Sequence, residues 1–146
     1  MLSPDMCEEF SSVYVKKIVD AVQDDTFTVV LHNCGNTVKL IESMIGTGAL
    51  CFHFGNAVDL VDILPQIPED RIAMGNIDPV SIFKNGTVME MKEKVKALLE
   101  KMKKYKNFVL SSGCDVPPNS PIENVTAFYE ALKEYNEKES PASSER

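Results

Sequence analysis

The architecture of this chain can be worked out from one segment, Phe27-Thr28-Val29-Val30-Leu31-His32-Asn33-Cys34-Gly35-Asn36-Thr37. Its first five residues are mostly β-branched or aromatic, which predicts a strand over 27–31. Such a strand delivers His32 and Cys34 to its C-terminal end. Their side chains point the same way there, with Cα atoms about 6.5 Å apart. Apolar residues at helical spacing then predict a helix over 36–45.

The rest of the chain repeats this strand–loop–helix unit. Ser3-Pro4-Asp5 predicts the start of an additional helix before the first strand, and Asp78 can cap a helix that begins at Pro79. Uninterrupted alternation of strands and helices favours a parallel sheet with right-handed crossovers. The predicted fold class is therefore α/β, with four parallel strands that are each followed by a helix and with an extra N-terminal helix. The further predicted strands span 49–54, 71–74 and 108–112, and the further predicted helices span 57–64, 87–105 and 122–136.

Four such units make half of an eight-fold (β/α)8 TIM barrel. A half barrel has two long parallel edges and an uncovered inner face, which are liabilities for a free monomer. We therefore expect a complement, which is either a missing N-terminal barrel half, a second copy in a dimer, or a partner chain. The half-barrel domain is predicted over 1–138, and the polar residues 139–146 are predicted to be a disordered tail.

Composition excludes several classes of partner. The chain has 146 residues and a net charge of −7, which argues against nucleic acid and against an anionic membrane surface. It contains no run of about 18 apolar residues and no basic N-terminal region followed by an apolar one, so a cytoplasmic location is expected. The four cysteines are too few and too scattered for a secreted disulfide scaffold, which leaves reduced thiols or metal ligation.

Three of the polar side chains at strand ends form a possible metal-ligand set. An imidazole from His32 and thiolates from Cys34 and Cys114 suit zinc and leave one coordination position open. A structural zinc site would usually show paired Cys-x-x-Cys motifs, and the sequence has none. The pattern favours a catalytic site over a structural one. The alternative is that these are ordinary core thiols and a hydrogen-bonded histidine, which is the interpretation we prefer for Cys51.

Short motifs at the predicted strand ends carry a family resemblance. They are His32-x-Cys34-Gly35-Asn36-Thr37, Gly75-Asn76-Ile77-Asp78-Pro79, Gly113-Cys114 and Pro121-x-Glu123-Asn124. With them the chain resembles the C-terminal half of the uroporphyrinogen decarboxylase superfamily over residues 3–135. Within it, the chain is most similar to the zinc-dependent corrinoid:thiol methyltransferases, such as methylcobamide:coenzyme M methyltransferase.

This resemblance implies a zinc ion (Zn2+) held by His32, Cys34 and Cys114. A substrate thiol would occupy the open position, where its pKa falls. The thiolate would attack the methyl group of a methyl-corrinoid carried by a partner protein. The implied partners are thus a corrinoid protein and a small thiol acceptor.

The sequence departs from that pattern after the second predicted strand. Related methyltransferases have a carboxylate there that can fill the fourth position, whereas this chain has His53 and no acid nearby. His53 could replace that ligand, hydrogen-bond the substrate, or be an ordinary core histidine. Asn76 could line the substrate pocket or fix the turn at Asp78-Pro79.

Two other functions stay open. One is an enzyme of the uroporphyrinogen decarboxylase type, which would bind no metal and would need cationic groups from elsewhere. Resemblance argues against it, because true decarboxylases carry a histidine near the position of Cys114 and lack the His-x-Cys pair. The other is a truncated, non-catalytic half barrel that still binds zinc.

Overall fold

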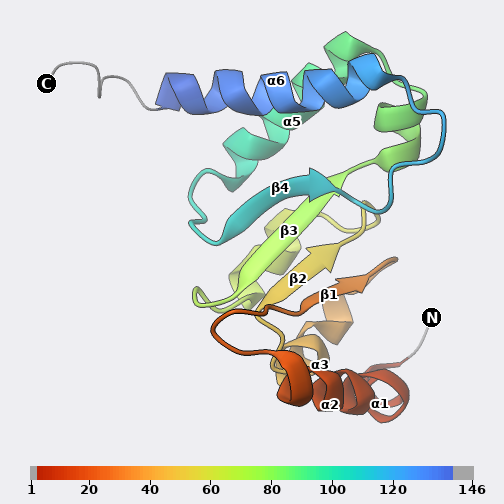
Figure 1. The fold of residues 1–146 in the computed structure, drawn as a ribbon, viewed down its shortest axis with the longest axis vertical. Coiled ribbons are helices and arrows are strands. Elements are labelled where there is room, and N and C mark those ends of the chain that lie inside the picture. Colours follow the sequence, from red (N-terminus) through yellow and green to blue (C-terminus); the bar gives the residue numbers. More distant parts are fainter. Residues whose placement is uncertain (1–2, 140–146) are drawn as a thin grey trace, which may run out of the picture.

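The computed structural model describes residues 3–139, which form a four-stranded sheet flanked by helices (Figure 1). The strands are β1 Val30–Asn33, β2 Cys51–Phe54, β3 Ile72–Ile77 and β4 Phe108–Ser112. The α-helices are α1 Pro4–Cys7, α2 Val13–Val22, α3 Ile41–Gly46, α4 Leu60–Ile63, α5 Val88–Met102 and α6 Ile122–Glu139. Short π or 3-10 segments are η1 Glu8–Ser12, η2 Val38–Leu40, η3 Leu64–Gln66 and η4 Pro79–Lys84.

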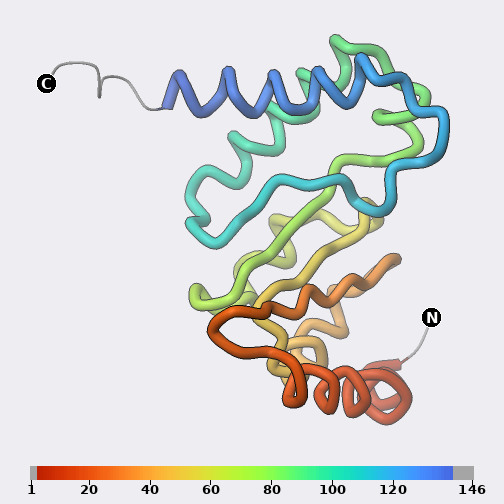
Figure 2. The backbone as a smooth tube through the Cα atoms, in the orientation of Figure 1, coloured from red at the N-terminus to blue at the C-terminus, as the bar shows by residue number. Residues whose placement is uncertain are grey.

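The sheet has the order β1-β2-β3-β4, and every neighbouring pair is parallel. The colours in Figure 2 accordingly pass across the sheet in chain order, from orange in β1 to blue-green in β4. Each strand is followed by helical structure, and α1 and α2 precede the first strand. The predicted α/β fold of a half (β/α)8 barrel is confirmed.

The two faces of the sheet differ in what covers them. Leu31, Phe52, Ala73 and Phe108 lie in register on one face and belong to, or pack against, the larger hydrophobic cluster. Alternation along each strand places the neighbouring row, which contains His32 and His53, on the opposite face. The site residues thus lie on the face away from the core.

The core lies between the helices and the face of the sheet that carries Phe52 and Ala73. Figure 1 shows α1, α2 and α3 beside β1, and α5 with α6 beyond β4. In α5, Met91, Val95 and Met102 are buried, as their helical spacing predicts. Phe83 and Phe128 pack together in a second cluster with ring centroids 5.3 Å apart.

The N-terminal helical region begins as predicted but buries only part of its apolar residues. The Ser3 hydroxyl accepts a hydrogen bond from the Met6 backbone at 3.2 Å, and Pro4 occupies the first turn. Val19 is buried, whereas Phe10 and Ile18 are 60% and 57% exposed. An apolar stripe of this region is therefore largely exposed in the described part of the chain.

Several predicted boundaries were wrong. The first strand begins at Val30, not at 27, because the Asp24 carboxylate accepts hydrogen bonds from the backbones of Thr26 and Phe27 and forms a turn there. The third strand extends to Ile77, so Asn76 lies within it rather than in a loop.

Several helix boundaries in the structure also differ from the predicted ones. The helix predicted over 36–45 begins as the 3-10 turn η2 and continues as α3. The long helix predicted over 87–105 is α5, which begins with a Thr87–Glu90 capping box and ends earlier, at Met102. The last helix, α6, reaches Glu139, which is the first residue of the predicted tail, and residues 140–146 lie outside the described part.

Among residues 3–139, no helix combines the length and the apolar character that crossing a bilayer requires.

Candidate metal centre

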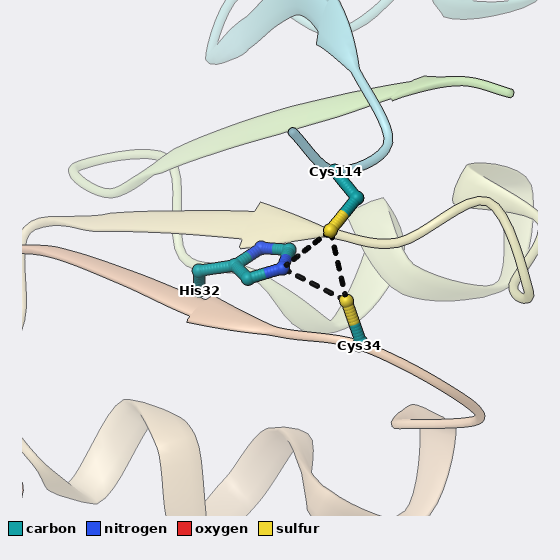
Figure 3. A group of neighbouring side chains, drawn as sticks. All are labelled: His32, Cys34 and Cys114. Carbon is teal, nitrogen blue, oxygen red and sulfur yellow. Dashed lines mark hydrogen bonds between the residues drawn. The ribbon is translucent and has the colours of Figure 1, made fainter. Parts of the chain in front are cut away.

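His32, Cys34 and Cys114 meet at the carboxyl-terminal edge of the sheet (Figure 3). The His32 Nε2 atom lies 2.9 Å from Cys34 Sγ and 3.7 Å from Cys114 Sγ. The two sulfur atoms are 3.5 Å apart. Within residues 3–139, this is the one group of three metal-ligating side chains whose ligand atoms all lie within 4.8 Å of one another.

These separations fit a zinc ion. Zinc–sulfur bonds of about 2.3 Å and zinc–nitrogen bonds of about 2.0–2.1 Å place tetrahedral ligand atoms about 3.5–3.8 Å apart. The Cys34–Cys114 and Cys114–His32 distances match, and the His32–Cys34 pair needs to open by about 0.6 Å. His32 and Cys34 are exposed, so a fourth position is open to an external ligand.

The His32 ring is oriented by a backbone group. Its Nδ1 atom lies 3.2 Å from the carbonyl oxygen of His53, which can only accept. Nδ1 therefore carries the hydrogen, and Nε2 keeps its lone pair toward the two sulfur atoms. A histidine that binds a metal through one nitrogen commonly donates its other N–H in this way.

The surroundings of Cys34 disfavour the thiolate form of its side chain. Its hydrogen bond to the Cys114 sulfur raises the pKa of Cys34, and partial burial and the nearby charges of Cys114 and Asp115 add to the rise. A divalent metal ion bound between the two sulfur atoms would favour the thiolates instead.

Two glycines allow the ligand-bearing loops to approach each other. A Cβ atom on Gly55 would lie 3.3 Å from Cys34 Cα, and one on Gly113 would lie 2.7 Å from the Asn56 backbone nitrogen. The loops after β1, β2 and β4 therefore touch at positions where a side chain would intrude. Sequence reasoning missed both roles, although Gly113 stands directly before Cys114.

The side chains of Asn76 and His53 hydrogen-bond to backbone carbonyls. The Asn76 amide donates to the carbonyls of Gly55 at 3.0 Å and Val58 at 2.8 Å, so it fixes the loop after β2. His53 Nε2 lies 2.6 Å from the Ser112 carbonyl oxygen. The structure therefore places neither side chain as a fourth member of the ligand group.

The other expected features of the strand ends are present. The Asp78 carboxylate accepts hydrogen bonds at 2.8 Å from the backbones of Val80 and Ser81, so the predicted cap is confirmed. Cys51 is buried, and this burial raises the pKa of its thiol. The packing role that the sequence favoured for Cys51 agrees with this environment.

Comparisons with known proteins agree with the fold and with the motifs. The family profile described as Uroporphyrinogen decarboxylase (URO-D) matches residues 1–135. Methylcobamide:CoM methyltransferase MtbA of Methanosarcina acetivorans is 32% identical over 135 residues, which are 92% of this chain and 38% of that protein. A uroporphyrinogen decarboxylase of Prochlorococcus marinus is also 32% identical, over 93% of this chain and 38% of its own.

A solved structure is similar as well. A methyltransferase from Methanosarcina mazei superposes with a TM-score of 0.80 and 26% sequence identity, over 93% of this chain and 39% of that chain. The chain thus spans well under half the length of these relatives.

Proposed function

The chain belongs to the uroporphyrinogen decarboxylase family, whose members are enzymes, and on that basis we propose that it is part of a zinc-dependent methyltransferase. In this proposal a small thiol accepts a methyl group from a methyl-corrinoid on a partner protein. The thiol releases its proton, and its sulfur forms a bond to the methyl carbon as the carbon–cobalt bond breaks. The electron pair of the carbon–cobalt bond stays on cobalt.

The observation that carries the proposal is the meeting of His32, Cys34 and Cys114 within 4.8 Å. The two cysteines are 80 positions apart in the sequence, so only the fold brings them together. Two sulfur atoms and one imidazole nitrogen form a donor set that suits zinc and leaves a fourth position for substrate. A zinc ion bound there would lower the pKa of a substrate thiol and so supply a nucleophile at neutral pH.

The chain's own residues would prepare this site in three ways. The His53 carbonyl holds the His32 ring with Nε2 facing the sulfur atoms. Gly113 brings Cys114 close to the loop that follows β2. The position of the ligands at the carboxyl-terminal edge of the sheet would leave access for a thiol and for the corrinoid that must approach it in line.

Metal analysis tests this proposal. Protein purified without chelators should contain one zinc ion per chain, and Cys34→Ser should lose most of it because a hydroxyl is a poor zinc ligand. Cys51→Ser is the matched control, since Cys51 is outside the ligand group and should leave the zinc content unchanged. A zinc content near zero in the unmodified protein would reject the metal site.

Methyl transfer from methylcobalamin to a panel of small thiols, with coenzyme M included, then tests the reaction. Turnover that requires Cys34 supports the methyltransferase. Zinc binding without turnover, even when an N-terminal half from a methyltransferase relative is supplied, favours the non-catalytic zinc-binding half barrel.

A decarboxylase of the uroporphyrinogen type is the second candidate, favoured by relatives of that name at equal identity. Such an enzyme would bind its substrate carboxylates through cations. On the open face of the sheet, however, the row formed by His32, His53, Met74 and Val109 contains no lysine or arginine. Binding of a porphyrinogen to zinc-free protein would support this candidate.

We also propose that this face of the sheet is covered in the working protein, by an N-terminal barrel half or by a second copy. Val30 and Ile72 are 51% and 40% exposed on the face that carries His32. Among the described residues, β1 and β4 each have a strand neighbour on one side only. A native mass of twice 16.2 kDa would support a second copy, and a mass of 16.2 kDa with capture of a co-expressed N-terminal half would support the other arrangement.

A further inference from the structure

We propose that His53 is a positioning residue that links the two segments carrying the zinc ligands. This inference rests on the metal site proposed above. It assigns His53 a role different from that of a fourth ligand or a substrate contact.

The contacts of His53 reach both segments. Its backbone carbonyl accepts a hydrogen bond from Nδ1 of His32 at 3.2 Å. Its side-chain Nε2 donates to the carbonyl of Ser112 at 2.6 Å. The Ser112 hydroxyl in turn donates to the carbonyl of Cys114 at 2.7 Å. One residue of β2 is therefore connected to His32 in β1 and, through Ser112, to the backbone of Cys114.

The side-chain contact joins strands that are not neighbours. In the sheet, β3 lies between β2 and β4, and Met74 of β3 is the residue paired with His53. The backbone ladders of the sheet therefore provide no direct link from β2 to β4. The hydrogen bond from His53 to Ser112 spans β3 and holds the end of β4 toward the ligands of β1.

The geometry also explains why Nε2 of His53 does not serve as a ligand. Its N–H is directed at a carbonyl oxygen, and a nitrogen that donates its hydrogen has no lone pair for a metal. The His53 ring lies beside that of His32, with centroids 4.6 Å apart and planes tilted by 39°. His53 thus supports the His32 ring from one side while its N–H fixes the far segment.

A series of variants at one position tests this role. His53→Phe keeps a ring of similar shape but removes the donor, and His53→Gln places an amide N–H close to the position of Nε2. We expect His53→Phe to weaken zinc binding about 10- to 100-fold, which is the usual loss when a residue that orients metal ligands is removed. We expect His53→Gln to recover much of that affinity. Cys51→Ala, two positions earlier on the same strand, is the control and should match the unmodified protein.

Zinc affinity is measured by competition with a chelating dye. The absorption spectrum of the cobalt-substituted protein gives a second readout, because its bands depend on the coordination geometry. The spectrum of His53→Phe should shift and that of His53→Gln should resemble the unmodified protein. If His53→Phe does not fold, His53→Asn replaces it, since its shorter amide cannot reach Ser112.

The outcomes separate this inference from the metal site itself. If the unmodified protein binds no zinc, the metal site is wrong. If it binds zinc and the Phe or Asn variant binds equally tightly with an unchanged cobalt spectrum, the positioning role is overturned. Equal weakening by Gln and by Phe would also overturn it, because the donated hydrogen bond would then not be what matters.

Discussion

At the scale of single residues, the site depends on two glycines, which have no side chain, as well as on the three candidate ligands. Gly55 and Gly113 lie where the loops after β1, β2 and β4 meet. A Cβ atom on Gly55 would push against the loop after β1, and one on Gly113 would push against the loop after β2. Neither glycine is a ligand or touches a substrate. Their contribution is to permit the approach that brings Cys114 to 3.5 Å from Cys34.

Gly113→Ala should weaken zinc binding and the fold together. The added methyl group would lie 2.7 Å from the backbone nitrogen of Asn56, so the loops must separate. Overpacking of this kind costs about 1–3 kcal/mol in the free energy of unfolding. Chemical denaturation and dye competition measure the two effects.

Gly46→Ala is the matched control for this substitution. Gly46 is the last residue of α3, and a Cβ atom there would meet nothing within 4 Å. The change should be neutral or stabilising by up to about 1 kcal/mol, because alanine restricts the unfolded chain. If Gly113→Ala and Gly46→Ala have the same zinc affinity and the same free energy of unfolding, the close contact at Gly113 does not matter for either property.

At the scale of elements, α5 and α6 are joined by an ion-pair network of partly buried side chains. The Glu134 carboxylate lies 2.6 Å from Lys96 Nζ and 3.0 Å from Lys92 Nζ. The hydrogen bonds from Lys96 and Lys92 lower the pKa of Glu134 to about 2. Since these side chains remain partly exposed to water, solvent screens their interaction and limits what it contributes to stability.

The Glu134→Gln variant should therefore show a pH-dependent difference from the unmodified protein. A lowered folded-state pKa means that the stabilisation is complete above the unfolded value of about 4.3 and is lost as the pH falls toward about 2. Urea denaturation should give a larger difference between the two proteins at pH 7 than at pH 2.

Glu137→Gln is the control for the ion-pair network. Glu137 has one lysine partner, Lys133 Nζ at 3.8 Å, on its own helix. It should show a smaller pH dependence than Glu134→Gln. A difference that is the same at both pH values would contradict the proposed contribution of Glu134.

The sequence was a good guide to elements and a poorer one to contacts between them. Short β-branched and aromatic runs predicted the four strands of the described sheet, and helical spacing of apolar residues predicted the order of the helices, because burial imposes these patterns locally. The start of β1 was wrong because a local Asp24 turn competes with the strand. The metal-ligand set followed from residue types, whereas the hydrogen bond from His53 to Ser112 depends on how the sheet curves and could not be inferred from spacing.

At the scale of the whole molecule, part of the exposed apolar surface lies beside an open edge of the sheet. An exposed stripe on the N-terminal helices contains Phe10, Tyr14 and Ile18, which are 60%, 57% and 57% exposed. These helices lie beside β1, whose outer edge has no strand neighbour in the described part of the chain. A complementary unit that pairs with β1 would be placed to cover both.

Ile18→Lys should weaken assembly without disturbing the fold. The side chain is already 57% exposed, so the charge costs little in the isolated chain, but it would be buried at an interface. Native mass measurement over a range of concentrations should show more of the smaller species. Val61→Lys is the control, since Val61 is 40% exposed on α4 and is apart from the stripe.

The ligands lie in or directly after the first and the last strand of the sheet, and His32 and Cys114 are 82 positions apart. A bound ion would therefore cross-link the two outer strands and close the residues between them into one loop. Fraying of either outer strand would release the ion, and in the same way a supply of zinc would oppose fraying. At a free concentration one hundred times its dissociation constant, zinc would add about 2.7 kcal/mol to the free energy of unfolding. For a half barrel, the concentration of available zinc would then influence the fraction of the protein that is folded.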